Sequence, residues 1–374
     1  MNIAFFTNLR APYRTLQLNE YVRDSKKNID VFYTDDFKKN RKWETGKAKF
    51  REYDLRKNGI INYLRLYKTI KDYDIIIIGG YYKFVYIFVS LFSKLLGKSC
   101  ILLFDGISTD RLNIKEKKAK FILKSLIVKN SDYILGNGEI SKRYFREKFK
   151  YPEERIFNQY LSVDIDLIKE LSSIKNIKQA DLKKKMNIEV DKRVIIYSGR
   201  LVEIKNVDLI VEALNKNQFK NSIHLLIVGG GELEKNIKEK CFKYGISVTI
   251  TGFLSKQEEV FNYYNMGDLF ILPSKIEPWG LVVQEAMAAG LPILVSKTSG
   301  CALDFVKEGI NGFSFDPNSS LDLNKKITKM FSDDSILDKM SKESVMIAEN
   351  WTFQKSNKEL NKVIHLVKKS KELL

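Results

Sequence analysis

The stretch LFILPSKIEPWGLVVQEAMAAGLPILVS, residues 269–296, places a strand, a loop, a helix and a second strand in direct succession. Leu269–Leu272 and Ile293–Val295 are apolar runs of strand length, and the helical pattern between them begins near Gly280. Apolar strands separated by a helix are typical of a parallel sheet that helices cover on both faces. This segment therefore predicts an α/β fold.

The same alternation extends through both halves of the chain. We expect strands at Ile3–Thr7, Asp30–Tyr33, Asp74–Ile78, Cys100–Phe104, Tyr133–Leu135, Val194–Ser198, His224–Val228, Ser247–Thr251, Leu269–Leu272 and Ile293–Val295. Two such series predict two doubly wound, Rossmann-like domains, in which ligands bind at the carboxyl ends of the strands. If the two domains face each other, the site lies in the cleft between them.

A chain of 374 residues is too long for one ordinary core, so two domains are expected. A Lys-rich, polar stretch between Ser162 and Asp191 separates the two series of strands. We therefore predict a first domain at residues 1–186 and a second at residues 187–350. Residues 351–374 form an amphipathic helical pattern, in a position that allows it to pack back on the first domain.

The positive charge of the chain is concentrated in its first half. Residues 1–186 contain 39 Lys and Arg against 22 Asp and Glu, whereas residues 187–374 contain 25 against 24. A basic domain favours an acidic partner, such as an anionic membrane, a phosphorylated acceptor or a nucleic acid. A solvated basic surface without a partner is the alternative.

Residues 37–53, FKKNRKWETGKAKFREY, mix cations with Trp43, Phe50 and Tyr53. Such a segment can lie at a lipid interface, and a solvated loop explains it equally well. The longest apolar stretch, Ile75–Phe92, is interrupted by two glycines and a lysine, so we predict a strand, a glycine turn and a buried helix from Tyr82 rather than a membrane span. No signal peptide is expected.

Cysteine and histidine are scarce. The three cysteines form no Cys-x-x-Cys pair and are expected to be buried thiols in a reducing compartment. Two histidines exclude a histidine-rich metal site, and His224, within an apolar run, is expected in a strand of the core. The pair Asp164-x-Asp166 opens a helical pattern, which favours helix capping over metal binding.

Glu277 lies in a tight Pro/Trp/Gly segment, and Glu285 lies on the first turns of the helix that follows. Carboxylates so placed can converge on one polyhydroxylated ligand, because sugar and ribose hydroxyls donate hydrogen bonds to them. An amphipathic helix with solvated glutamates would give the same spacing. The neighbouring basic and glycine-rich segments favour the binding site.

The first of these segments is SGRLVEIKN, residues 198–206. It places Arg200 and Lys205 on the loop after a strand, with Asn206 as the expected N-cap of the next helix. Two cations beside a helix N-terminus form a site for a diphosphate, and two surface cations are the alternative.

Two further loops follow strands in the second half. The run VGGGE contains Gly229, Gly230 and Gly231, which let backbone amides approach a phosphate or a base, or simply form a tight turn. In TGFL, Phe253 and Leu254 can stack on a nucleobase or pack inside the domain.

The order SGRLVEIKN, VGGGE, TGFL and PSKIEPWGLVVQEAMAAGLPILVS resembles the retaining, nucleotide-sugar-dependent glycosyltransferases of family 4, which have the two-domain GT-B architecture. The resemblance is strong across residues 194–318. It is fainter in the first half, where FFTNLRAPYR looks like the first strand and loop of that family and residues 129–162 also match.

The resemblance implies roles for the charged residues. Arg200 and Lys205 would hold the donor diphosphate and stabilise charge on the leaving nucleotide. Glu285 would bind the ribose hydroxyls, and Glu277 would contact the donor sugar near the reacting carbon. The backbone amides after Glu277 would contact sugar hydroxyls or phosphate; they belong to Trp279, Gly280 and Leu281. The base would be bordered by Gly230, Phe253 and Leu254.

This chain departs from the family in its first half. Many relatives carry a histidine there that faces the donor sugar, but no histidine precedes His224. Asp105, in the run ILLFDGIST, is the candidate for that place, and a turn or helix-cap aspartate is equally compatible. Tyr13 and Arg14 are candidates for the donor or acceptor side of the cleft, or are structural.

The resemblance predicts a retaining transferase that moves a hexose or N-acetylhexosamine from a UDP-sugar, without a metal or other cofactor. The acceptor would be a glycan or a polyprenyl-diphosphate-linked glycan in surface polysaccharide or glycoconjugate synthesis, and the enzyme would be cytoplasmic and peripheral at the inner face of the membrane. The alternatives are a sugar phosphorylase or nucleotide-sugar epimerase of the same architecture, and a nucleic-acid-binding protein, for which no motif is present.

Overall fold

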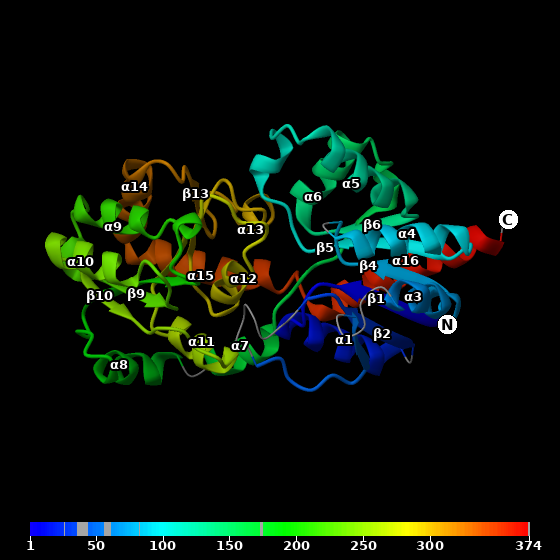
Figure 1. Ribbon diagram of the computed structural model, residues 1–374. Helices are drawn as coiled ribbons and strands as arrows, with labels where there is room; N and C mark the ends of the chain where they lie inside the picture. The colour runs from blue at the N-terminus through cyan, green and yellow to red at the C-terminus, as the bar shows by residue number, and fades with distance from the viewer. Residues whose placement is uncertain (26, 36–43, 56–60, 82, 173–174, 373–374) are drawn as a thin grey trace. The chain divides into compact units, whose positions relative to one another are not determined.

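A computed structural model of the chain describes residues 1–374 except 26, 36–43, 56–60, 82, 173–174 and 373–374. The chain divides into two α/β units, each built on one sheet (Figure 1). The first unit comprises Met1–Ile107, Arg111–Ser162 and Thr352–Leu374, and the second comprises Ser108–Asp110 and Val163–Trp351.

The first unit contains a seven-stranded sheet in the order β3-β2-β1-β4-β5-β6-β7, with parallel pairing throughout. Its strands are β1 (Asn2–Thr7), β2 (Asn28–Tyr33), β3 (Arg51–Asp54), β4 (Ile75–Ile78), β5 (Ser99–Phe104), β6 (Tyr133–Gly136) and β7 (Ile156–Asn158).

The second unit contains a six-stranded parallel sheet in the order β10-β9-β8-β11-β12-β13. Its strands are β8 (Arg193–Ser198), β9 (Ile223–Val228), β10 (Ser247–Ile250), β11 (Leu269–Leu272), β12 (Ile293–Ser296) and β13 (Gly312–Phe315). All ten strands expected from the sequence are confirmed, with small differences in bounds. Three strands were not expected, β3, β7 and β13, and each lies at the edge of its sheet.

Helices cover both faces of the first sheet because its strands are apolar on both sides. Phe6 points into one hydrophobic cluster and Phe5 into the other. The Phe6 side is covered by α3 (Ile61–Lys71), α4 (Phe84–Leu95), α5 (Lys118–Asn130) and α6 (Gly138–Phe149). The Phe5 side is covered by α1 (Pro12–Ser25) and by the C-terminal helix α16 (Phe353–Glu372), which places Leu360, Val363, Ile364 and Val367 in the cluster.

The second unit has two groups of helices in mutual contact, α9, α10 and α14 in one and α7, α11, α12 and α15 in the other. Their bounds are α7 (Ile165–Ser172), α8 (Lys175–Lys185), α9 (Asp208–Asn215), α10 (Glu234–Tyr244), α11 (Gln257–Tyr264), α12 (Leu281–Ala288), α13 (Ala302–Phe305), α14 (Ser320–Phe331) and α15 (Asp334–Ala348). Because α7 packs on α11 and α12, residues 163–186 belong to this unit, whereas the sequence-based division assigned them to the first domain.

Both sheets reverse their strand order in the middle. The reversal falls between β1 and β4 in the first sheet and between β8 and β11 in the second. In doubly wound sheets the loops at the carboxyl ends of such strands form the ligand site. The loops after β8 and β11 carry Arg200, Lys205 and Glu277, which the sequence had singled out.

Several local expectations are confirmed. The three cysteines are buried and free. His224 lies in β9 with both ring nitrogens near the hydroxyls of Ser247 and Thr249, and its burial lowers its pKa to about 4. Asp164 accepts a hydrogen bond from the backbone N–H of Leu167 (3.1 Å), as a cap of α7 should.

The helix expected after β4 is present, but it is buried on one face only. Helix α4 begins at Phe84 and leaves four large apolar side chains exposed, while Tyr82 lies outside the described residues. Within the described ranges no helix is long and apolar enough to span a bilayer.

We predict that Ile364→Ala destabilises the first unit by about 2–5 kcal/mol, because the side chain is fully buried between α16 and the sheet. The neighbouring His365→Ala is the control, since this side chain is exposed and its loss should change the free energy of unfolding by less than about 0.5 kcal/mol. Denaturant unfolding of both variants measures the difference. Equal effects would show that α16 contributes no core to the first unit.

Candidate active site

The loops after β8, β9 and β10 lie against one another through their backbones. The N–H groups of Gly199 and Leu201 donate to the carbonyls of Val228 and Gly230, each at 3.0 Å. A Cβ atom added at Gly229 would overlap the carbonyl oxygen of Gly199. Glycine is therefore required at this position by the packing of neighbouring loops.

Gly230 faces the third loop. A Cβ atom there would meet the Cα of Gly252 and the backbone nitrogen of Phe253 at 3.3 Å. Phe253 is 54% exposed and Leu254 is partly buried. The three residues expected to border a base thus lie together, and an exposed aromatic ring is available for stacking.

Arg200 and Lys205 have different environments although both follow β8. Arg200 is exposed and makes no ion pair with any residue that the structure describes, while its carbonyl accepts a hydrogen bond from the Tyr197 hydroxyl (2.9 Å). Lys205 ends the 3₁₀ turn Glu203–Lys205 and forms an ion pair with Glu277.

The expectation that Asn206 caps the next helix is wrong. Asn206 has φ +57°, and its side-chain amide donates to the carbonyls of Pro273 (3.1 Å) and Pro317 (2.9 Å). Helix α9 begins after Val207 without a side-chain cap. Asn206 instead ties the loop that carries Lys205 to the start of the loop that carries Glu277.

Glu277 is held in place by the loop that follows β12. Its carbonyl accepts a hydrogen bond from Gly300 N–H (2.9 Å), and the carbonyl of Trp279 accepts one from Cys301 N–H (3.2 Å). The Ser296 hydroxyl donates to the carbonyl of Ser274 (2.7 Å) at the start of the same loop. These contacts fix the backbone on both sides of the Glu277 carboxylate.

The Lys205–Glu277 pair is mostly buried, with 19% and 11% of the two side chains exposed. Such a pair carries a desolvation cost, and removal of one partner leaves an uncompensated charge. The structure therefore brings an ammonium group and a carboxylate together where the sheet reverses its strand order.

Glu285 lies on α12, eight residues after Glu277 of the preceding loop, and is buried. One of its carboxylate oxygens accepts a hydrogen bond from the Tyr264 hydroxyl (2.9 Å). Burial raises the pKa of Glu285 to about 7, against the smaller opposing effect of this hydrogen bond. Because the pKa of this carboxyl group is near 7, a ligand that donates hydrogen bonds to it stabilises the ionised form.

Helix α12 begins at Leu281, directly after Gly280 with φ +99°. The N–H groups of a first helical turn lack partners within the helix, so the backbone around Leu281 can receive an anion. The side chain of Trp279 points into the domain, where it packs on Phe305 (ring centres 5.2 Å apart) and Trp351 (5.0 Å). The side chain of Trp279 therefore faces the core, and only its backbone amide is placed for the expected contact with the ligand.

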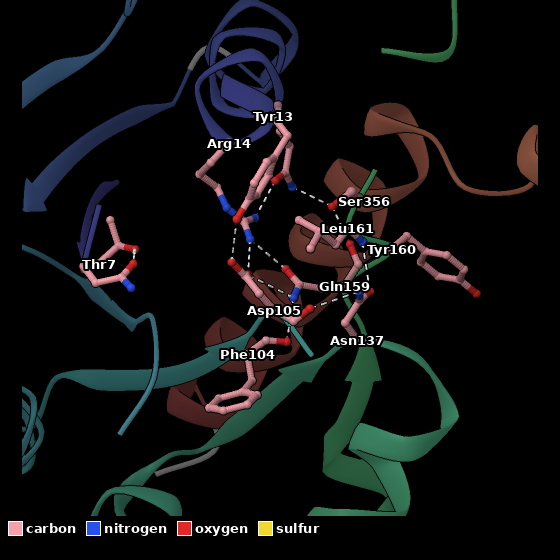
Figure 2. A network of polar contacts seen from close by, with 12 residues as sticks. Thr7, Tyr13, Arg14, Phe104, Asp105, Asn137, Gln159, Tyr160, Leu161 and Ser356 are labelled. Atoms are coloured by element: carbon pink, nitrogen blue, oxygen red, sulfur yellow. Dashed lines mark hydrogen bonds and ion pairs between the residues drawn. The ribbon is translucent and has the colours of Figure 1, made fainter. Parts of the chain in front are cut away.

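In the first unit, Asp105, Arg14 and Tyr13 meet (Figure 2). Asp105 follows β5 and forms an ion pair with the buried guanidinium of Arg14, on α1. The Tyr13 hydroxyl donates to the second carboxylate oxygen of Asp105 at 3.1 Å. Asp105 is about half exposed, so its carboxylate is oriented by Arg14 and still reaches solvent.

Further polar groups support this cluster (Figure 2). Gln159, after β7, accepts from Arg14 (3.1 Å) and donates to the carbonyl of Phe104 (2.6 Å). The Ser356 hydroxyl, on α16, donates to the carbonyl of Gln159 and accepts from Gln17 (2.5 Å). The C-terminal helix thus helps to fix the guanidinium that orients Asp105.

The residues that sequence reasoning missed are supports. Tyr264, Gln159 and Gln17 contact predicted residues, and Ser356 contacts Gln17 and Gln159. The strand that precedes Gln159, β7, was itself not expected from the sequence, so it offered no signal for this residue. No group of His, Cys, Asp or Glu among the described residues is arranged to hold a metal ion.

Residues 178–345 match the family model described as Glycosyl transferases group 1. The putative glycosyltransferase YtcC of Bacillus subtilis is 27% identical over 292 residues, 75% of this chain and 70% of that protein. The lipopolysaccharide 1,2-N-acetylglucosaminetransferase of Salmonella typhimurium is 30% identical over 167 residues, 41% of this chain and 43% of that protein. The chain thus spans about two fifths of the length of some curated relatives and about two thirds of others.

Crystal structures of HepE from Anabaena, in complex with UDP and with UDP-glucose, superpose with TM-scores of 0.79 and 0.75 at 17% identity. They cover 98% of this chain and 100% and 99% of HepE. The likeness shows the fold, which is the GT-B fold of two Rossmann-like domains, as expected.

We predict that Gly229→Ala costs more than about 3 kcal/mol, because it adds a clash with the Gly199 carbonyl to the strain of φ +137°. Gly245→Ala is the matched control, since Gly245 has φ +64° but open space around it, and about 1–2 kcal/mol is expected. The measurement is the free energy of unfolding of each variant, compared with that of the natural chain. A cost at Gly229 no larger than at Gly245 would contradict the tight packing of these loops.

The raised pKa of Glu285 predicts a pH-dependent stability. The folded state favours the protonated carboxyl, so the stability that this group contributes is fully present below its ordinary pKa of 4.5 and is lost as the pH rises to about 7. The free energy of unfolding of Glu285→Gln, relative to that of the natural chain, should therefore increase by up to about 3 kcal/mol between these pH values and stay constant above them. Urea unfolding at several pH values measures this, with the exposed Glu258→Gln as control. A pH-independent difference would refute the shift.

Proposed function

We propose that this chain, whose residues 178–345 match the Glycosyl transferases group 1 family model, transfers a hexose or N-acetylhexosamine from a UDP-sugar to a glycan acceptor. The observation that carries the proposal is the arrangement of Lys205, Glu277 and Glu285 around the strand reversal of the second sheet. The UDP and UDP-glucose bound by HepE, which shares the fold, support the choice of donor.

The donor diphosphate would lie at the loop after β8 and the start of α12. Arg200 offers an exposed guanidinium, Lys205 offers an ammonium group, and the first turn of α12 offers backbone N–H groups. Together they would neutralise the charge that develops on the departing nucleotide, since preorganised donors stabilise such charge without a metal ion.

The ribose would lie against Glu285. Two vicinal hydroxyls can donate to one carboxylate, and Tyr264 already fixes one of its oxygens. Donation to the ionised form would lower the pKa of Glu285 on binding. Phe253 and Leu254 would border the base, together with Gly230, which packs against the loop that carries them.

The transferred sugar would lie at Glu277. In the free chain Lys205 neutralises this carboxylate, and a bound diphosphate would give the ammonium group a second anion. Glu277 would then accept hydrogen bonds from the sugar and stabilise positive charge at the reacting carbon. We propose retention of configuration, with front-face attack and transfer of the acceptor's proton to the leaving phosphate.

In the first unit we assign Asp105 to the place that a histidine occupies in many relatives. Arg14 and Tyr13 orient its carboxylate, and Gln159 and Ser356 hold Arg14. An oriented carboxylate that reaches solvent can accept a hydrogen bond from a sugar hydroxyl. Tyr13 and Arg14 would therefore act mainly through Asp105.

The acceptor we propose is a glycan or a lipid-linked glycan in surface polysaccharide synthesis. The Salmonella relative is named for lipopolysaccharide, which supports an acceptor of this class. The basic first half suits a polyprenyl-diphosphate group or an anionic membrane at the cytoplasmic face. We propose that neither a metal ion nor another cofactor is needed.

We predict that a UDP-sugar raises the melting temperature, since a ligand of the folded state at 100 times its Kd stabilises by about 2.7 kcal/mol. Glu285→Gln should abolish this shift, because it removes the ribose acceptor. Glu277→Gln should largely retain the shift and reduce UDP release from the donor by about 100-fold or more. A thermal-shift panel of UDP-, GDP- and ADP-sugars, with UDP release measured in parallel, provides the readouts.

Glu258→Gln is the control for loss of a surface carboxylate and should leave both readouts unchanged. Equal loss of binding in the Glu277 and Glu285 variants would contradict their separate roles. Formation of an epimer or a sugar phosphate in place of UDP would identify an epimerase or a phosphorylase instead.

A further inference from the structure

Helix α4 turns its most apolar side outward. Its exposed side chains recur at steps of four, three and four residues, and so share one face. They are Phe84 (71% exposed), Phe88, Leu91 and Leu95 (77% exposed). The buried face includes Tyr86 and Val89 of the core, together with Ser90 and Ser93. A surface helix of a globular domain normally has a polar outer face, so a helix that is apolar on its outer face as well is unusual.

Helix α5 also carries an apolar outer face. It exposes Ile122, Leu123 and Leu126, while it buries Ile127 and Val128 together with Lys124. The ammonium group of Lys124 is paired with Glu116 and lies 4.7 Å from the ring centre of Tyr81, and these partners offset part of the cost of its burial. The charge on this part of α5 is thus turned inward, and the outer face is left apolar.

The two outward stripes adjoin, because α4 and α5 pack against each other on the same side of the first sheet (Figure 1). We call them the α4–α5 surface, which consists of Phe84, Phe88, Leu91, Leu95, Ile122, Leu123 and Leu126. Contiguous apolar patches on a soluble domain mark a site of interaction with another protein or with a membrane.

The charged side chains on the two helices themselves are all basic. Neither helix contains an aspartate or a glutamate. Exposed lysines edge the surface at both ends of α5 and near the end of α4; they are Lys94, Lys117, Lys118, Lys120 and Lys129. An apolar centre with ammonium groups at its rim complements acyl chains beneath anionic headgroups.

We propose that the α4–α5 surface lies on an anionic lipid bilayer. The apolar side chains would enter the boundary between headgroups and acyl chains, and the lysines would contact lipid phosphates. At 12 and 13 residues the two helices are too short to span a bilayer, so the contact is peripheral. The proposal extends the proposed function: it assigns membrane attachment to a defined surface, and this attachment does not depend on which sugar is transferred.

The lipid interface expected at residues 37–53 is less favourable. Residues 37–43, with Trp43, lie outside the described residues. Of the remainder, Phe50 packs on the first unit's core and Tyr53 stacks on Phe32 with ring centres 4.7 Å apart. These two aromatic side chains are engaged within the unit, whereas Phe84 of the α4–α5 surface is 71% exposed.

The test is co-sedimentation of the full chain with vesicles of phosphatidylglycerol and phosphatidylcholine, and with vesicles of phosphatidylcholine alone. Binding is expected only to the anionic vesicles and should weaken with salt. Phe84→Ser/Leu95→Ser should reduce the bound fraction at least about tenfold. Lys118→Gln/Lys120→Gln should weaken binding and its salt dependence. Phe242→Ser is the matched control, because Phe242 on α10 is 90% exposed in the other unit.

Each variant must keep the thermal shift with the UDP-sugar, which shows that it is folded and separates this proposal from the proposed function. Unchanged binding in Phe84→Ser/Leu95→Ser, or equal loss in Phe242→Ser, would overturn the proposal. Sedimentation equilibrium gives the remaining outcome. A dimer that dissociates in Phe84→Ser/Leu95→Ser, without vesicle binding by the natural chain, would assign the surface to a second copy and would also overturn it.

Discussion

The ion pair between Lys205 and Glu277 joins residues 72 positions apart in the sequence and closes the two loops at the strand reversal of the second sheet. Both charged groups are mostly buried, so in the absence of a ligand each is compensated by the other. Hydrogen bonds from Asn206 and from the loop after β12 fix the backbones of the two loops. Helix α12, which carries Glu285, begins directly after the second of these loops. The rest of the candidate donor site is arranged around this pair.

The pair also suggests how the free chain keeps a reactive arrangement stable. A lone buried ammonium or carboxylate would be costly, and pairing offsets part of that cost. A diphosphate would compete with Glu277 for Lys205 and leave the carboxylate available to the sugar. The first unit uses the same principle at the Arg14–Asp105 pair, where a buried cation orients a carboxylate that reaches solvent. In the first unit the carboxylate of the pair reaches solvent, whereas in the second unit both members are mostly buried.

The sequence predicted the interior strands and missed three edges for a physical reason. An interior strand such as β4, Ile75–Ile78, is buried on both faces and is therefore a continuous apolar run. The edge strand β3, Arg51–Asp54, is polar and largely exposed, so no apolar pattern marks it. Glu277, Glu285 and Lys205 could be found from their sequence context, but the pairing of Lys205 with Glu277 and the contact of Tyr264 with Glu285 could not. The contact of Ser356 with Gln159, for example, depends on α16 returning to the first sheet.

The central claim is that the Glu285 carboxylate, with its pKa near 7, binds the donor ribose in ionised form. The most direct measurement is calorimetric titration of UDP-glucose near neutral pH in buffers of different ionisation enthalpy, because this donor has no phosphate proton to lose there. The account predicts that the natural chain releases a fraction of a proton on binding. Glu285→Gln should show no release and much weaker binding. Binding to the natural chain without proton release, or unchanged release in Glu285→Gln, would contradict it.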